Sequence, residues 1–118
     1  MPFLFVYGSL KRGCYNNYML TQGGAKFLGE CKIVGYELYT THGYFPYMVE
    51  SNNGGKVKGE LWEVPEETYQ RIRRMELGAG YKEVNMNGII FYLYPREKLP
   101  PHAKKIESGV WVESYSSS

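Results

Sequence analysis

The hydrophobic positions of this chain mostly form short apolar runs or alternate with polar residues, a pattern typical of β-strands. The first run, residues 3–7, is continuously apolar and rich in aromatic and β-branched side chains, which predicts a strand buried on both faces. Residues 25–40 read as another strand, with bends or bulges expected at Gly29 and Gly35. The first third of the chain is therefore predicted to be mainly sheet.

A β-hairpin is predicted in the middle of the chain. Residues 44–50 and 56–64 have strand-like patterns, and the connection at 52–55 consists of asparagine and glycine, which favour tight turns. Pro46 lacks a backbone N–H, so we expect it at a sheet edge or a bulge. The two segments are expected to pair with each other.

A second hairpin and a last strand are predicted in the C-terminal part. Asn87-Gly88 is the dipeptide best suited to a type I′ turn, and it joins residues 82–86 to residues 89–94. Residues 110–112 are apolar and partly β-branched, which predicts a final strand. The turn dipeptide makes this hairpin the strongest local signal in the sequence.

One convincing helix is predicted between the two hairpins, over residues 65–76. Tyr69, Ile72 and Met75 recur at the spacing of one helix face, while charged residues occupy the other positions. Pro65 suits the first turn, where its missing N–H costs no hydrogen bond. We therefore expect an amphipathic helix packed on the sheet.

A short second helix and a single domain complete the predicted fold. Asn16 or Asn17 is expected to cap a helical segment over residues 18–20, which ends at a pair of glycines. The pattern indicates the α+β class, with a mixed, curved sheet closing towards a β-barrel. We expect one domain over residues 1–115 and a frayed tail over residues 116–118.

Composition and charge limit the classes of function. The chain has 118 residues, of which 43% are hydrophobic, and its formal net charge is only +2. This mixed charge gives no electrostatic footprint for duplex nucleic acid or an anionic membrane. Twelve tyrosines could stack single-stranded bases. Most of them fall in strand-like runs, which favours core and cavity lining instead.

Cysteine usage and the N-terminal run indicate an intracellular protein. Cys14 and Cys31 lie far apart, without the spacing of a zinc site or a redox motif, so free thiols are the simpler prediction and a disulfide stays open. The apolar run at residues 3–7 is too short for a signal segment or a membrane span. We therefore expect a cytoplasmic protein.

The loop after the first strand is the first candidate for ligand binding. Gly8 removes a Cβ, Ser9 supplies a hydroxyl, and the N–H groups of the turn are expected to lack partners, which favours anion binding. Lys11 and Arg12 follow directly and would add positive charge beside the loop. Many glycine turns bind nothing, so this loop alone does not establish a site.

Glu76 is the second candidate, because it does not fit the pattern of its helix. It lies four residues after Ile72 and seven after Tyr69, which places it at the end of the apolar face. Burial would raise its pKa towards neutrality and suit it to proton transfer. The alternatives are a solvated carboxylate at a frayed helix end and a buried carboxylate paired with an arginine.

These features together resemble the γ-glutamylcyclotransferase-like proteins (AIG2-like), and most closely the γ-glutamylamine cyclotransferase branch. The similarity runs in order through nearly the whole chain. The matching residues are Tyr7-Gly8-Ser9-Leu10, Asn16 or Asn17, Pro46, Val57-Lys58-Gly59-Glu60-Leu61, Met75-Glu76 and Tyr81.

The resemblance implies an enzyme, its chemistry and its site. In the family the residue matching Glu76 is the general acid and base, and the loop matching Tyr7, Gly8, Ser9 and Leu10 holds the γ-glutamyl group. The implied reaction closes 5-oxoproline on the substrate's own α-amine and expels an amine, with no metal or cofactor. Aromatic residues such as Tyr81 and Tyr115 would shield the small-molecule substrate from water.

Departures from the family pattern bear on pocket shape and substrate choice. Met75 stands where members often carry aspartate, Leu77 where they carry glycine, and Glu83 where they carry arginine. A covalent scheme with Ser9 as nucleophile is a rival, although no histidine lies near it in sequence. A non-catalytic module that binds a metabolite or protein in the same pocket is the alternative function. Oligomeric state stays open.

Overall fold

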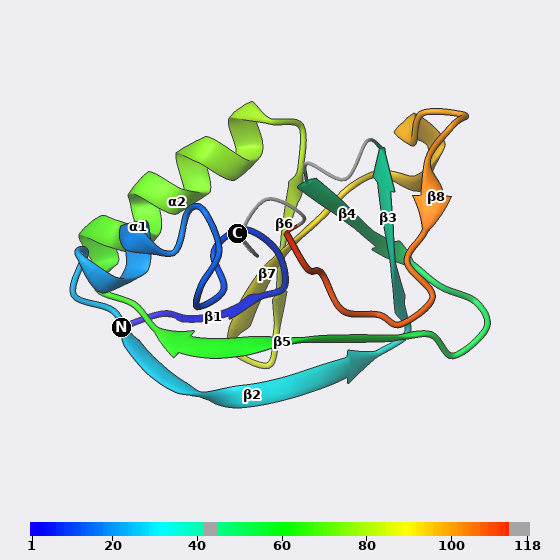
Figure 1. Ribbon diagram of the computed structural model, residues 1–118. Helices are drawn as coiled ribbons and strands as arrows, with labels where there is room; N and C mark the ends of the chain where they lie inside the picture. Colours follow the sequence, from blue (N-terminus) through cyan, green and yellow to red (C-terminus); the bar gives the residue numbers. More distant parts are fainter. Residues whose placement is uncertain (42–44, 114–118) are drawn as a thin grey trace.

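The computed structural model describes residues 1–41 and 45–113, which form two β-sheets accompanied by helices (Figure 1). The larger sheet has the strand order β2-β5-β1-β7-β6, and the smaller has the order β4-β3-β8. The strands are β1 (Phe3–Val6), β2 (Lys26–Val34), β3 (Tyr36–Thr41), β4 (Phe45–Glu50), β5 (Lys56–Glu63), β6 (Lys82–Met86), β7 (Ile89–Leu93) and β8 (Lys104–Lys105). The helices are α1 (Tyr18–Thr21), α2 (Glu66–Gly78) and the 3-10 helix η1 (Arg96–Lys98).

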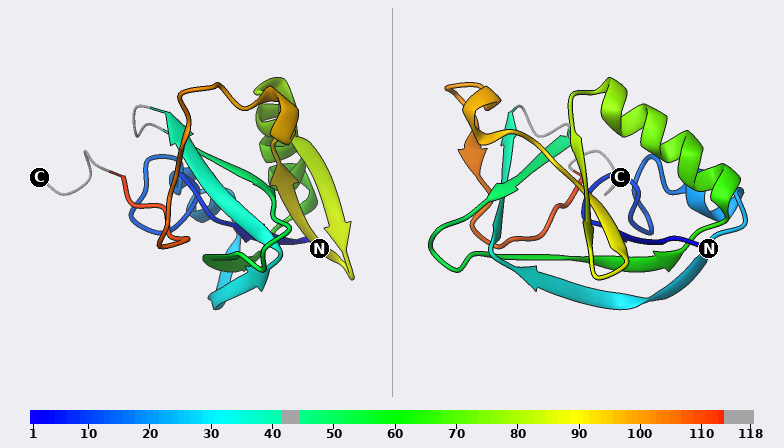
Figure 2. Two further views of the ribbon diagram at one scale, coloured as in Figure 1. Left: turned by 90° about the vertical axis from the view of Figure 1, so that its right-hand side faces the viewer. Right: turned by 180° about the vertical axis from the view of Figure 1, so that it is seen from behind.

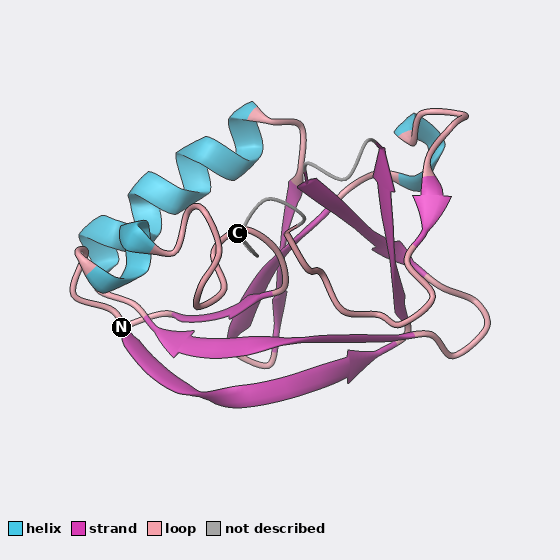
Figure 3. Ribbon diagram, viewed as in Figure 1, coloured by secondary structure: helices cyan, strands magenta, loops and turns pink. Residues whose placement is uncertain are grey.

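The helices α1 and α2 lie at one end of the molecule, and the smaller sheet lies at the other end (Figure 3). Strands β2 and β5 run between these two ends, as the view from behind in Figure 2 also shows. The α+β class and the mixed sheet are confirmed, because β1 pairs antiparallel with β5 and parallel with β7. In the described residues the larger sheet stays open, with β2 and β6 at its edges, and closes no barrel.

Strand β1 is buried on both faces, as its apolar run predicts. Leu4 and Val6 belong to a core that includes residues of α2, whereas Phe5 and Tyr7 belong to a second core formed with β3 and β4. Its central place in the sheet explains why alternate residues reach two different cores. The loop that follows β1 therefore begins at a strand that is packed against both cores.

Both predicted helices are present, but the capping prediction for the short one is wrong. Helix α2 begins at Glu66 and continues two residues past the predicted end. Asn17 precedes α1 with helical dihedral angles and makes no side-chain cap. Its amide Nδ2 instead donates to the carbonyl oxygen of Leu10 at 2.8 Å, and the Asn16 Nδ2 donates to the hydroxyl of Ser9 at 2.9 Å. The side chains of both asparagines therefore stabilise the loop that precedes α1.

The hairpin around Asn87-Gly88 is confirmed, with both residues at positive φ (53° and 90°) as a type I′ turn requires. The hairpin predicted between residues 44–50 and 56–64 is wrong. Strand β4 pairs with β3, and β5 pairs with β2 and β1, so the two segments lie in different sheets. Tyr44 lies outside the described residues. Pro46 occupies an edge strand, as predicted.

The chain changes sheets at Gly35, which explains this error. Gly35 has a φ of 100° and separates the predicted strand 25–40 into β2 and β3. Its N–H donates to the carbonyl of Gly55 at 2.7 Å, and its own carbonyl accepts from the N–H of Ser51 at 2.9 Å. The chain thus passes between the two sheets twice, once at Gly35 and once in the connection at residues 51–55, and these two segments are hydrogen-bonded to each other. The turn-rich connection therefore joins two sheets and does not close a hairpin.

The strand predicted at residues 110–112 is also wrong. Trp111 is only 3% exposed and is buried without belonging to a strand, whereas Val112 is 73% exposed. The last strand is β8, two lysines that pair with β3 and carry no strand-like pattern. The tail at 116–118 lies outside the described residues. No helix of the described chain is long and apolar enough to span a bilayer.

Candidate active site

A cavity of about 180 Å³ opens where the loop after β1 meets the last turn of α2. The loop contributes Tyr7, Gly8, Ser9 and Leu10 to its lining, and α2 contributes Met75 and Glu76. Ala79, Tyr81, Asn16, Tyr92, the start of β4 and the end of β1 complete it. Four segments far apart in sequence thus meet around one small concave space, the kind of place where small molecules bind.

The loop is shaped by close packing and by hydrogen bonds from the residues that follow it. An added Cβ on Gly8 would lie 2.8 Å from the Cγ of Pro46, so this position leaves no room for a side chain. Ser9 is held on both its carbonyl and its hydroxyl by Asn16, at 2.8 and 2.9 Å. The loop is therefore fixed before any ligand arrives.

The loop also keeps unused hydrogen-bond donors. In residues 1–41 and 45–113, the N–H groups of Gly8, Ser9 and Leu10 donate no hydrogen bond. Backbone N–H groups clustered in a turn form a concave site for a carboxylate or a developing oxyanion. These residues line the cavity, and anion binding by the loop stays a prediction.

Lys11 and Arg12 follow the loop directly, but they do not line the cavity. The Lys11 Nζ donates to the carbonyl of Trp111 at 2.7 Å. The Arg12 Nε donates to the buried Glu60 at 3.2 Å, and the guanidinium lies 3.7 Å from the ring centre of Phe27. Both cations therefore contact other parts of the protein, and these contacts hold the loop in place.

Glu76 projects from the last turn of α2 into the cavity lining, and its side chain is half-buried. Burial raises the pKa of this carboxyl from its ordinary value to about 7. Across the described residues it makes no hydrogen bond and no ion pair. Of the alternatives that the sequence left open, the described structure does not support pairing with an arginine.

Tyrosines surround the Glu76 carboxyl. The Tyr81 hydroxyl donates to the carbonyl of Pro46 at 2.7 Å, and the Tyr7 hydroxyl donates to the carbonyl of Tyr92 at 2.7 Å. Burial, followed by nearby charges that include Glu76, raises the pKa of both Tyr7 and Tyr81. These phenols stay neutral near pH 7, so they add no negative charge beside the carboxyl.

The structure brings most of the predicted site residues together. Tyr7, Gly8, Ser9, Leu10, Tyr81 and Glu76 all line the cavity. Tyr115 lies outside the described residues. In residues 1–41 and 45–113, the Ser9 hydroxyl contacts the Asn16 amide and no base, which gives no support to a nucleophilic serine.

Sequence reasoning missed several contributors to the cavity wall, including Ala79, Tyr92 and Phe45. Tyr92 belongs to β7, and Phe45 begins β4, where nothing in the strand pattern distinguishes a cavity residue from a core residue. Pro46 was recognised only as an edge residue, although its ring covers Gly8. Within the described residues, no three His, Cys, Asp or Glu side chains gather in a way that could hold a metal ion.

Comparisons with known proteins find relatives over almost the whole chain. The family described as "Gamma-glutamyl cyclotransferase, AIG2-like" matches residues 4–113. A relative from Pyrococcus horikoshii, named "Putative gamma-glutamylcyclotransferase PH0828", is 42% identical over 111 residues, which are 92% of this chain and 89% of that protein. Its crystal structure aligns with a TM-score of 0.77 at 36% identity, covering 94% of this chain and 90% of that one.

Two further relatives extend the similarity. The "Gamma-L-glutamyl-butirosin B gamma-glutamyl cyclotransferase" of Niallia circulans is 37% identical over 76 residues, 64% of this chain and 46% of that protein. The crystal structure of an AIG2-like protein from Mus musculus aligns with a TM-score of 0.68 at 26% identity, covering 85% of this chain and 84% of that one. The match over almost the entire sequence shows that this chain belongs to the AIG2-like gamma-glutamyl cyclotransferase family.

Proposed function

We propose that the chain is a cyclotransferase that releases 5-oxoproline and a free amine from a γ-glutamyl amine. The substrate's α-amine nitrogen attacks its own γ-carbonyl carbon, and the bond from that carbon to the leaving nitrogen breaks. No water, metal or cofactor enters this balance. The observation that carries the proposal is a carboxyl with a pKa of about 7 in the same cavity as the loop with free N–H donors.

Glu76 would move the proton in both steps. The α-ammonium must lose a proton before its nitrogen can attack, and the leaving nitrogen must gain one before it departs. A carboxyl whose pKa lies near 7 exchanges protons efficiently at neutral pH, in contrast to an ordinary glutamate. One group can therefore accept the proton first and return it afterwards.

The loop of residues 7–10 would hold the γ-glutamyl group. Its unused N–H donors suit the α-carboxylate or the oxyanion that forms at the γ-carbonyl. A donor placed for such an oxyanion is typically worth about 2.7–4 kcal/mol of transition-state stabilisation. Because nucleophile and electrophile belong to one molecule, a fixed loop also accelerates the reaction by selecting the cyclising conformer.

The charge of the cavity supports an amine as the leaving group. No lysine or arginine of the described chain lines the cavity, so a carboxylate on the leaving half would meet no cation there. Glu76 would repel such a carboxylate. The Niallia circulans relative is named for action on γ-L-glutamyl-butirosin B, which supports a γ-glutamyl compound as substrate here.

The test is 5-oxoproline release by purified protein from a panel of γ-glutamyl amines, γ-glutamyl dipeptides and glutathione. We expect release from the amines above all, and its loss in Glu76→Gln. Glu67→Gln is the matched control, because Glu67 is an exposed carboxylate in the first turn of the same helix. Its activity should equal that of the wild type.

Two results would reject the proposal. Full activity in Glu76→Gln would remove the assigned role of that residue. No release from any compound, together with ligand binding that is indifferent to Glu76→Gln, would favour the alternative of a non-catalytic binding module.

A further inference from the structure

Glu83 on β6 connects helix α2 to the sheet beside the candidate site. Its Oε1 accepts hydrogen bonds from the hydroxyl of Tyr69 at 2.7 Å and from the hydroxyl of Tyr92 at 2.9 Å. The same oxygen lies 3.4 Å from the Nε of Arg73, an ion pair. Tyr69 and Arg73 come from α2, and Tyr92 is the cross-strand partner of Glu83 on β7. One carboxylate oxygen thus receives three donors from two elements.

Arg73 is also a neighbour of Glu76 on the helix surface. The two residues are three positions apart on α2, a spacing at which side chains lie side by side and ion pairs form. The Arg73 side chain is 41% exposed, so packing alone does not fix its guanidinium. Its direction towards β6 depends on the carboxylate of Glu83.

The other groups that face Glu76 carry no charge near neutral pH. They are Tyr7 from the loop, Tyr81 before β6 and Tyr92 on β7, whose pKa values burial raises first and neighbouring groups, Glu76 among them, raise further. Arg71 and Arg74 occupy other sides of α2. Arg73 is therefore the cation of the described chain that is best placed to reach the Glu76 carboxyl.

We propose that Glu83 is a positioning residue of the site: it holds the Arg73 guanidinium against β6 and so keeps the Glu76 carboxyl without a cationic partner. The inference rests on the proposed function for its catalytic meaning, although its physical content concerns Glu76 alone. An arginine beside a carboxylate favours the ionised form and lowers the carboxyl pKa by about 1–3. A freed Arg73 would thus make Glu76 a weaker base.

The experiment is an NMR titration of the Glu76 carboxyl in the full-length protein, compared among variants. Glu83→Gln is the sharpest change, because the amide oxygen still accepts from Tyr69 and Tyr92 while the ion pair with Arg73 is lost. We expect the Glu76 midpoint to fall from about 7 by about one pH unit, the lower end of the usual effect, because Arg73 is partly exposed. In Arg73→Gln, and in the double variant, it should stay near 7.

A matched control separates this effect from a general change in charge. Glu66→Gln removes an exposed carboxylate from the same helix, one that accepts a hydrogen bond from Gln70 at 2.8 Å. The Glu76 midpoint should be unchanged in this variant. In an active enzyme, the acidic limb of the rate profile should move to lower pH in Glu83→Gln and return in the double variant.

Two outcomes would overturn the inference. An unchanged midpoint in Glu83→Gln would show that Glu83 does not control the surroundings of Glu76. A midpoint lowered equally in the double variant would assign the effect to the lost charge of Glu83 and not to Arg73. Because the titration needs no turnover, absence of 5-oxoproline release would reject the proposed function while leaving this test intact.

Discussion

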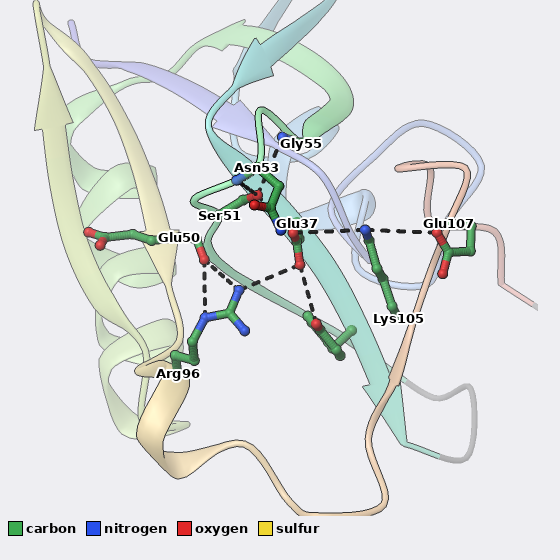
Figure 4. Close-up of polar contacts among 9 residues, drawn as sticks. Glu37, Glu50, Ser51, Asn53, Gly55, Arg96, Lys105 and Glu107 are labelled. Carbon is green, nitrogen blue, oxygen red and sulfur yellow. Dashed lines mark hydrogen bonds and ion pairs between the residues drawn. The ribbon is translucent and has the colours of Figure 1, made fainter.

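Two glutamates of this protein, Glu37 and Glu76, stand in opposite surroundings. Glu37 on β3 is 7% exposed and has several partners around its carboxylate (Figure 4). It accepts hydrogen bonds from Ser51 at 2.7 Å and Tyr39 at 3.2 Å, and it pairs with Arg96 at 3.5 Å and Lys105 at 3.8 Å. The Ser51 hydrogen bond is the largest cause that holds the pKa of Glu37 below its ordinary value.

Glu76 differs in partners more than in burial. Its side chain is only half-buried, yet burial raises its pKa to about 7 because nothing in the described residues stabilises the charge. Glu37 is more buried and remains a strong acid, because two cations and two hydroxyls offset the cost of burying it. Burial raises the Glu76 pKa, and no partner in the described residues offsets it, which together suit this carboxyl to proton transfer.

The two roles follow from this difference. Glu37 joins β3 to the loop at 51–55, to η1 and to β8, and Figure 4 shows Arg96 and Lys105 on either side of it. Arg96 also donates to the carbonyl of Glu50 at 2.6 Å, which extends the connection to the end of β4. Glu37 stabilises the smaller sheet, whereas Glu76 faces a cavity.

The largest expected effect is on catalysis. Glu76→Gln should lower kcat/KM for 5-oxoproline release by about 100-fold or more, since general acid and base catalysis typically contributes about 10²–10⁴. The folded structure should persist, because the replaced carboxyl makes no hydrogen bond or ion pair within the described chain. Steady-state kinetics and thermal unfolding measure the two properties. Equal losses of activity and stability would break the contrast with Glu37.

Glu37→Ala should show the reverse, a loss of stability with retained activity. Removing this carboxylate leaves the cations Arg96 and Lys105 without their buried partner and should lower the free energy of unfolding by about 2 kcal/mol. Urea denaturation measures the change. The Michaelis constant and the turnover of the folded variant should stay within a factor of about two, since Glu37 does not line the cavity. Unchanged stability would contradict the structural role.

A third change places a cation beside Glu76, as Glu37 already has. Ala79 lines the cavity three residues after Glu76, so Ala79→Arg should place a cation beside that carboxyl. We expect the Glu76 pKa to fall by about one pH unit, and the acidic limb of the rate profile to follow it to lower pH. Ala79→Gln is the uncharged control and should leave the pKa near 7. Identical NMR titrations of the two variants would count against the comparison.

The smallest expected effect removes one partner of Glu37. Ser51→Ala deletes the hydroxyl that most strongly favours the Glu37 carboxylate, and should cost about 1 kcal/mol of stability at neutral pH. The folded pKa of Glu37 lies below its unfolded value, so this group stabilises the fold above the unfolded pKa and loses that contribution as pH falls through the folded one.

Ser51→Ala should therefore bring the acid-induced loss of stability to a higher pH. Unfolding followed between pH 3 and pH 7 measures this, with Ser108→Ala as a control on an exposed turn. A variant that loses stability over the same pH range as the wild type would show that Ser51 does not influence the Glu37 carboxyl.

Much of the fold could be predicted where the signal is local. The continuous apolar run of β1, the period of α2 and the Asn87-Gly88 turn each depend on neighbouring residues. The placement of β4 and β5 in different sheets could not be predicted from their turn-rich connection. It depends on hydrogen bonds between Gly35 and residues 51–55, which are far apart along the chain.

In the candidate site, too, the features with a local sequence signal could be predicted and the tertiary contacts could not. Glu76 could be singled out because helical periodicity places it on an apolar face, and the loop because glycine interrupts a buried strand. The cover that Pro46 gives to Gly8, the wall formed by Tyr92 and the use of Arg12 as a support are tertiary contacts. No spacing in the sequence reports them, because their partners come from other elements.

The most direct test of the central claim is the pH dependence of kcat/KM for 5-oxoproline release from a γ-glutamyl amine. This parameter reports the ionisation of groups in the free enzyme and free substrate. If Glu76 without a cationic partner is the proton acceptor, the rate should fall on the acidic side with a midpoint near its pKa of about 7. A rate that stays constant from pH 8 down to pH 5 would contradict the account.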